Sequence, residues 1–243
     1  MVAVQRFTAR RADSPRPVMG VLLLSTDETL EEELRLTLPG RLGAAGSPKL
    51  HSARVISAPE VTEDSLAAMQ ATIPAGAAQL PAAPSYDVIG YGCTSATAVL
   101  GSKRVADLVR QGRACRAVTT PLDALVAWCA AHDVRRLAVL TPYSPEVSQR
   151  LVDAITQAGI EVVVLGAFDE PSEEAVVRIS PDSVVAASAE LMQGIEADAL
   201  FLSCTNLPTL EARARLEQSC AVPVVSSNSV LAWDMCRLAG ITL

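Results

Sequence analysis

Two stretches of the chain, "DVIGYGCTSA" at residues 87–96 and "DALFLSCTNL" at residues 198–207, repeat one pattern. Each begins with an aspartate, continues as an apolar run and ends in Cys-Thr followed by a small polar residue. They lie a little under half the chain length apart. A second pair, "GVLLLSTD" at 20–27 and "LAVLTPYS" at 137–144, is separated by a similar interval. The repeats predict two similar halves.

Short apolar runs alternate with helical patterns in both halves, for example "YDVIGYG" followed by "TSATAVLGSKRVADLVRQG", which reads as one helical pattern over 94–112. Continuous apolar strands are typical of parallel sheets covered on both faces. The predicted fold class is therefore α/β, with two similar parallel-sheet domains related by a pseudo-twofold axis. Gly159 and Gly240 are expected to end helices.

The expected organisation is an N-terminal tail at 1–17, a first domain at 18–125 plus 225–243, and a second domain at 126–224. The last helix would thus return to the first half. Ligands of open α/β sheets bind beyond the carboxyl ends of strands, where both Cys-Thr pairs fall. The active site is expected in the cleft between the domains.

The amino-acid composition excludes several classes of function. Half of the 243 residues are apolar, which allows a substantial core. A net charge of −7 with only 20 basic residues argues against nucleic acid as a partner. No apolar run is long enough to cross a bilayer, and the start lacks a signal-peptide pattern, so a cytoplasmic protein without membrane contact is expected. A homo-oligomer is compatible with this sequence.

Six cysteines without an export signal suggest reduced thiols that are buried, catalytic or metal-bound. A metal site is not expected, because there is no C-x2-C pair and neither histidine lies at ligand spacing from a cysteine. Cys93 and Cys204 follow strands at predicted helix starts and are the catalytic candidates. The other four are expected to be small packing residues: Cys115 in a connecting segment, Cys129 and Cys236 within helices, and Cys220 before a strand.

A thiol at a helix start is expected to have a lowered pKa, because the macrodipole and free N–H groups favour the thiolate. Two such thiols facing one ligand can move a proton from one face of a carbon to the other. The carbanion formed next to a carboxylate needs donors at its oxygens. Thr94, Ser95, Thr205 and Asn206 are candidates, and they also suit helix capping. Tyr143 follows a strand, and its hydroxyl could point into the cleft or lie in an ordinary turn.

The motifs "GCTS", "SCTN" and "LTPY" resemble the Asp/Glu racemase superfamily, in the branch of maleate isomerases and arylmalonate decarboxylases. The stretches "STDETLEEE", "YGCTSAT", "TPYSPEV", "LFLSCTNL" and "VVSSNSVLAW" are similar to Asp/Glu racemase-like proteins of ectoine and hydroxyectoine utilisation. The resemblance implies a cofactor-independent isomerase with a catalytic cysteine pair. It also implies that Tyr143 contacts a substrate carboxylate, with Thr94, Ser95 and Thr205 in oxyanion-binding turns.

In that family, racemases use both cysteines as acid and base, whereas maleate isomerases add the first cysteine to the double bond. Arylmalonate decarboxylases lack the first cysteine, so the presence of both Cys93 and Cys204 disfavours a decarboxylase of that kind.

Two positions depart from the maleate isomerase pattern. Asp27, in the "LSTD" turn with Ser25, and Glu173 stand where maleate isomerases carry substrate-binding asparagines. An ionised acid repels a carboxylate, so an amino-acid-like substrate with a cationic nitrogen fits these residues better than a dianion. Helix capping is the alternative role of Asp27, and Ser25 is expected to contact the substrate.

The leading hypothesis is a racemase or epimerase acting on an amino-acid-like carboxylate, possibly in ectoine utilisation. The alternative is a maleate-type cis–trans isomerase with a covalent Cys93 adduct. Two further hypotheses, an arylmalonate-type decarboxylase and a non-catalytic metabolite-binding protein, fit the sequence less well than these two.

Overall fold

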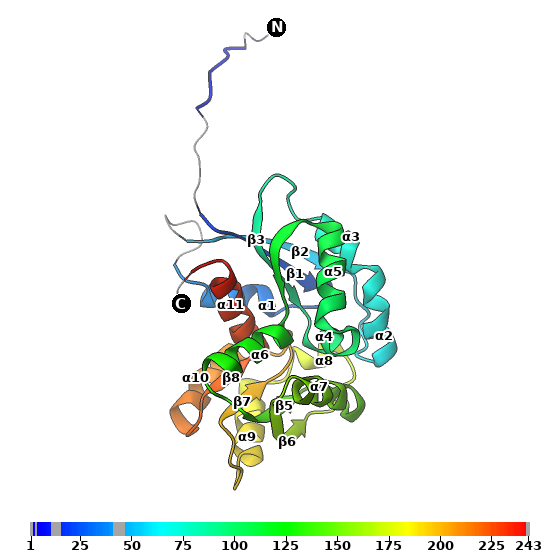
Figure 1. Ribbon diagram of the computed structural model, residues 1–243, viewed down its shortest axis with the longest axis vertical. Helices are drawn as coiled ribbons and strands as arrows, with labels where there is room; N and C mark the ends of the chain where they lie inside the picture. Colours follow the sequence, from blue (N-terminus) through cyan, green and yellow to red (C-terminus); the bar gives the residue numbers. More distant parts are fainter. Residues whose placement is uncertain (1, 3, 11–15, 41–46, 242–243) are drawn as a thin grey trace.

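A computed structural model describes residues 2, 4–10, 16–40 and 47–241 of the chain. It contains two four-stranded parallel sheets, seen in the upper and lower halves of the molecule in Figure 1. The first sheet has the order β2-β1-β3-β4, and its strands are β1 (Val18–Leu24), β2 (Lys49–Val55), β3 (Tyr86–Gly92) and β4 (Cys115–Thr119). The second has the order β6-β5-β7-β8, and its strands are β5 (Arg136–Thr141), β6 (Glu161–Ala167), β7 (Ala199–Leu202) and β8 (Val224–Ser226).

The two sheets share one strand order, with β1 to β4 corresponding to β5 to β8. The predicted fold class is confirmed: this is an α/β fold of two similar parallel sheets. The repeat recognised in the sequence falls on equivalent strands, because Cys93 follows β3 and Cys204 lies just beyond β7.

Helices cover both faces of each sheet. Those that follow the strands of the first half are α1 (Leu30–Thr37), α2 (Glu63–Ala68), the short 3-10 helix η1 (Met69–Ala71), α3 (Ile73–Ala78), α4 (Thr94–Leu100), α5 (Ser102–Gly112) and α6 (Pro121–Ala131). The remaining ones are α7 (Pro145–Gln157), α8 (Glu173–Val176), α9 (Pro181–Leu191), α10 (Leu210–Ser219) and α11 (Ser227–Leu238).

The continuous apolar sequence of β1 is explained by burial on both faces. Met19, Val21 and Leu23 pack in one core cluster with α1 and α11, whereas Leu22 and Leu24 point into another cluster. That second cluster also contains residues of β5 and β7, so apolar packing runs from one half into the other. Buried parallel strands of this kind need apolar side chains at every position rather than at alternate ones.

The last helix, α11, packs against β3 and β4 of the first sheet and against α1 and α6 (Figure 1). The predicted domain boundaries are not tested by these contacts and stay a prediction. Part of the predicted tail, 1–17, falls outside the described residues. Its described residues 2 and 4–10 are exposed and lie in no helix or strand, whereas Arg16 donates hydrogen bonds to Ser47 and Pro48.

Three local predictions are settled by backbone geometry. Gly159 and Gly240 follow α7 and α11 with φ of 86° and 72°, which confirms them as helix stops. The single helix predicted over 94–112 is wrong, because Gly101 has φ 82° and separates α4 from α5. Cys115 opens β4 instead of lying in a connecting segment.

Among the described helices, none combines the length and apolar character that crossing a bilayer requires.

Candidate active site

The two Cys-Thr turns meet where the halves join. The hydroxyl of Thr205 donates to the carbonyl of Gly92, the residue before Cys93, at 3.2 Å. The backbone N–H of Cys204 donates to Ser227 Oγ at 3.0 Å, and Ser227 Oγ lies 2.8 Å from Thr94 Oγ1. Both cysteines are therefore held in one polar network, as the repeated motif predicts.

Cys93 caps the helix that follows it. Its sulfur accepts a hydrogen bond from the N–H of Ala96 at 3.3 Å, and the Ser95 hydroxyl lies 3.5 Å away. Gly92 is required just before it, because a side chain there would collide with Leu30. The N–H groups of Thr94 and Ser95 stand in the first turn of α4, where no intrahelical acceptor exists, so they can donate to a ligand oxygen.

Cys204 occupies a different backbone conformation. Its φ is 107°, which is unusual for a residue other than glycine and is common where function requires a strained backbone. The prediction that Thr205 and Asn206 stand at a helix start is wrong, because α10 begins only at Leu210. Instead, the N–H of Asn206 donates to the Cys204 sulfur, and the Tyr143 hydroxyl donates to it from the end of β5.

The lowered thiol pKa expected from the helix start is overturned by burial. Cys93 and Cys204 are only 3% and 2% exposed. Desolvation raises the pKa of Cys93 to about 12 and that of Cys204 well above its usual range, although Ser95 and Ala96 lower the first and Tyr143 and Asn206 the second. Both thiols are consequently protonated in the free protein.

Two carboxyl groups lie close enough to oppose thiolate formation as well. Glu173, at the start of α8, and Asp27, after β1, both raise the pKa of each cysteine by charge repulsion. Burial raises the pKa of Asp27, and it raises the pKa of Glu173 to about 7 despite the hydrogen bond from Asn206. The structure thus places Asp27 and Glu173 near the cysteines, and their contact with a substrate stays a prediction.

The two roles considered for Asp27 are divided between its oxygens. Oδ1 accepts from the N–H groups of Thr29 and Leu30 at 3.0 and 2.8 Å and so caps the start of α1. Oδ2 is buried and has no hydrogen-bond partner among the described residues. One carboxylate therefore both fixes the turn and presents an unsatisfied oxygen.

Ser25 does not join this group. Its side chain is exposed and bonds to the hydroxyl and carbonyl of Ser57, away from the cysteines. The other predicted site residues, in contrast, are buried together: Asp27, Cys93, Thr94, Ser95, Tyr143, Glu173, Cys204, Thr205 and Asn206.

Three residues that support the site were not recognised as part of it. Ser227 connects the two turns, and the Asn228 side-chain amide donates to the carbonyl of Thr205 at 3.0 Å. Buried Glu33 accepts from Asn228 at 2.8 Å and from the N–H of Thr209 at 2.7 Å. For Ser227 and Asn228, the sequence signal was the polar run "SSNS" at residues 226–229. This run begins where β8, the fourth strand of the second sheet, ends.

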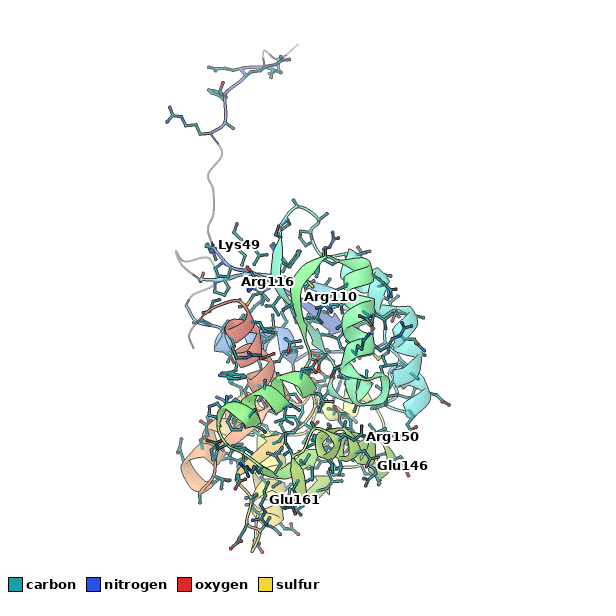
Figure 2. The ribbon with its side chains drawn as sticks, viewed as in Figure 1. Lys49, Arg110, Arg116, Glu146, Arg150 and Glu161 are labelled. Carbon is teal, nitrogen blue, oxygen red and sulfur yellow. The ribbon has the colours of Figure 1, made fainter. Side chains whose placement is uncertain are left out.

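Chain segments of both halves pair above the site. Glu60 and Ser172 form an isolated antiparallel bridge, and the N–H of Glu173 donates to the carbonyl of Pro59 at 3.0 Å. Arg150, on the outer face of α7 (Figure 2), forms an ion pair with Glu63 at 2.8 Å. Beside this bridge lies a surface hollow of about 450 Å³.

These features define an α/β protein with a cysteine pair buried between two similar halves. The arylmalonate decarboxylase family model matches residues 49–243, and the chain belongs to that family. The chain is 28% identical to the maleate isomerase of Pseudomonas putida KT2440, with 90% of each covered.

Solved structures of maleate isomerases are similar to this structure over nearly the whole chain. The maleate isomerase of Pseudomonas putida S16 with maleate has a TM-score of 0.83 at 26% identity, covering 93% of this chain and 92% of that one. A mutant of the Nocardia farcinica maleate cis–trans isomerase with a covalently bound succinylcysteine intermediate has a TM-score of 0.82 at 25% identity, covering 93% of each chain. The expectation of an isomerase agrees with these relatives.

Proposed function

We propose that this protein is a cofactor-independent racemase or epimerase that transfers protons at the carbon next to a carboxylate of an amino-acid-like substrate. The observation that carries the proposal is the junction of the Cys93 and Cys204 turns beside two buried carboxyl groups. One thiolate removes the proton from one face of the carbon, and the thiol opposite delivers its proton to the other face. The cysteines exchange protonation states in each turnover.

The carbanion places its charge on the substrate carboxylate oxygens. The first-turn N–H groups of Thr94 and Ser95 supply donors for those oxygens. Asp27 and Glu173 suit a cationic nitrogen on the same substrate, because neither of these acids favours a second carboxylate. The resemblance to ectoine utilisation proteins makes diaminobutyrate derivatives the first compounds to test.

The test is exchange of the α-proton for deuterium in heavy water. A panel of amino acids and N-acetyl-diaminobutyrates is incubated with the protein, and both isotope content and chirality are measured. We expect at least one compound to exchange and to invert, and we expect inversion to fall about 10³-fold in Cys93→Ala and in Cys204→Ala. Inertness of the whole panel would contradict the proposal.

The maleate isomerase relatives support a second candidate, cis–trans isomerisation of a maleate-like acid through a covalent Cys93 adduct. This reaction requires a substrate with two negative charges to bind next to Asp27 and Glu173. Fumarate formation from maleate, together with a substrate-sized mass addition on Cys93, would establish it. Neither signal is expected from a racemase of amino acids.

A further inference from the structure

Two carboxyl groups are buried beside the cysteine pair, and the only cation that acts on either is Arg54, whose charge lowers the pKa of Asp27 within the described part of the chain. Asp27 and Glu173 are 3% and 6% exposed. Within the described part of the chain, neither forms an ion pair. Arg54 lies near Asp27, but its Nη1 is held by the carbonyls of Leu24 and Asp27 at 2.8 and 2.7 Å. Buried acids without a partner are costly unless a ligand supplies the missing charge.

The unpartnered oxygen of Asp27 marks where such a charge would sit. Oδ1 is used by the start of α1, whereas Oδ2 is buried and makes no hydrogen bond of ordinary length within the described residues, although the Thr205 hydroxyl lies near enough to lower the pKa of Asp27. Asp27 and Glu173 also repel each other, since the charge of one raises the pKa of the other. The positive charge of a bound ammonium group would offset this repulsion.

Glu173 is connected through Asn206 to the thiol that it opposes. Its Oε2 accepts from Asn206 Nδ2 at 2.8 Å, and the backbone N–H of Asn206 donates to the Cys204 sulfur. After burial, the charge of Glu173 is the largest influence against the Cys204 thiolate, while its effect on Cys93 is smaller than those of the local hydrogen bonds. Of the two carboxyl groups, Glu173 therefore has the larger effect on Cys204 and Asp27 the smaller.

We propose that Asp27 and Glu173 form an ammonium subsite that keeps Cys204 protonated while it is empty, and that the substrate's own ammonium group releases this thiol for proton transfer. This inference rests on the proposed function and adds a way in which substrate binding regulates the Cys204 thiol. When the cation binds, the Cys204 proton leaves to water, and no other bond changes. A plain dicarboxylate lacks the cation and leaves the thiol inactive, which selects against maleate-like acids.

The first test compares Glu173→Gln with Glu174→Gln. Glutamine keeps an acceptor for Asn206 but removes the charge, while Glu174 is the exposed neighbour that pairs outward with Arg178. Alkylation by iodoacetamide at pH 8 is followed at each cysteine by peptide mass spectrometry. We expect Cys204 to react about tenfold faster or more in Glu173→Gln, because removing a like charge lowers a thiol pKa by about one unit or more.

Cys129 is an internal control, since it is buried in α6 and is opposed by the charge of Asp198 rather than Glu173. Its rate should not change, nor should any rate in Glu174→Gln. Equal Cys204 rates in the wild type and Glu173→Gln would overturn the proposal.

The second test uses methylammonium as the cation, with potassium chloride at equal ionic strength as the control. The alkylation rate of Cys204 by iodoacetamide should rise to saturation with methylammonium in the wild type and stay flat in Glu173→Gln. No rise in the wild type would overturn the subsite. Both tests use the free protein, so they can succeed while the exchange panel fails, which would refute only the proposed function. Exchange activity with unchanged thiol reactivity in Glu173→Gln would refute only this inference.

Discussion

The Cys93 turn (residues 91–97) and the Cys204 turn (residues 203–209) carry the same motif on equivalent strands, yet they are built differently. Cys93 is extended, with φ −153°, and caps α4 directly. Cys204 has φ 107° and is separated from α10 by an irregular segment. The first thiol is supported by its own helix, and the second depends on donors from elsewhere, including Tyr143.

This difference shows that a duplicated motif fixes where a residue stands in the fold but not how it ionises. The Cys204 turn is held by side chains distant in sequence, because Ser227 accepts from its backbone and Asn228 donates to it. In this turn the charge of Glu173 is, after burial, the largest influence on the thiol pKa. We therefore expect the two cysteines to have unequal roles, with Cys204 as the regulated one.

The largest effect is expected from removing either thiol. Cys93→Ala and Cys204→Ala should each lower racemisation by about 10³-fold, a typical contribution of a positioned acid or base. Each variant keeps one thiol, so α-proton exchange should survive for one enantiomer and the surviving enantiomer should differ between them. Chiral chromatography combined with deuterium analysis measures both. Exchange of the same enantiomer by both variants would show that the thiols do not face opposite sides of the substrate.

Removing Glu33 should be the most damaging change outside the reacting groups. This buried carboxylate accepts from the N–H groups of Thr209 and Leu210 and from Asn228, so Glu33→Ala leaves several donors unsatisfied. We expect a loss of about 3 kcal/mol in the free energy of unfolding, measured by urea denaturation. The matched control is Glu32→Ala, on the exposed side of α1, which should change stability by less than about 0.5 kcal/mol.

Glu173 should make stability depend on pH. Its pKa is raised from 4.5 to about 7 by burial, so between these values the carboxyl ionises in the unfolded chain but stays protonated in the folded one. Stability from this group is full below pH 4.5, falls as the pH rises and is lost above about pH 7, by roughly 3 kcal/mol in all.

Urea denaturation at pH 5 and pH 8 measures this dependence. The free energy of unfolding should decrease from pH 5 to pH 8 in the wild type and in Glu174→Gln. In Glu173→Gln this decrease should be smaller by the contribution of the Glu173 carboxyl group. If all three proteins respond equally to pH, Glu173 is not the buried group that titrates.

The sequence was sufficient for the sheets and for the grouping of most candidate site residues in one buried region. The period of the apolar runs predicted the strands, and the repeated Cys-Thr pair placed Cys93 and Cys204 at equivalent strand ends. Thiol ionisation could not be predicted, because it depends on burial that only the packed halves create. The role of Glu33 could not be predicted either, because its carboxylate accepts a hydrogen bond from Thr209, which is distant in the sequence.

A smaller effect is expected from Tyr143→Phe. The ring keeps its packing, but the hydroxyl that donates to Cys204 is lost, so the Cys204 thiolate becomes harder to form. The alkylation rate of Cys204 should fall about tenfold, the value for a pKa rise of one unit. Cys93 receives its hydrogen bonds from α4 and should keep its rate. An equal fall at both cysteines would mean that the phenol supports the whole site rather than one turn.

The smallest effect concerns the helix behind Cys93. Gly101 has φ 82° and ends α4, while the sequence pattern continues across it as one helix. A Cβ at this position meets no atom within 4 Å, so the cost of Gly101→Ala comes from the backbone alone and should be about 1 kcal/mol by thermal unfolding. Exchange activity should not change, because Cys93 lies at the opposite end of α4. An increase in stability would instead mean that α4 and α5 form one continuous helix in solution, and the Cys93 turn would then be fixed by a longer element than the one described here.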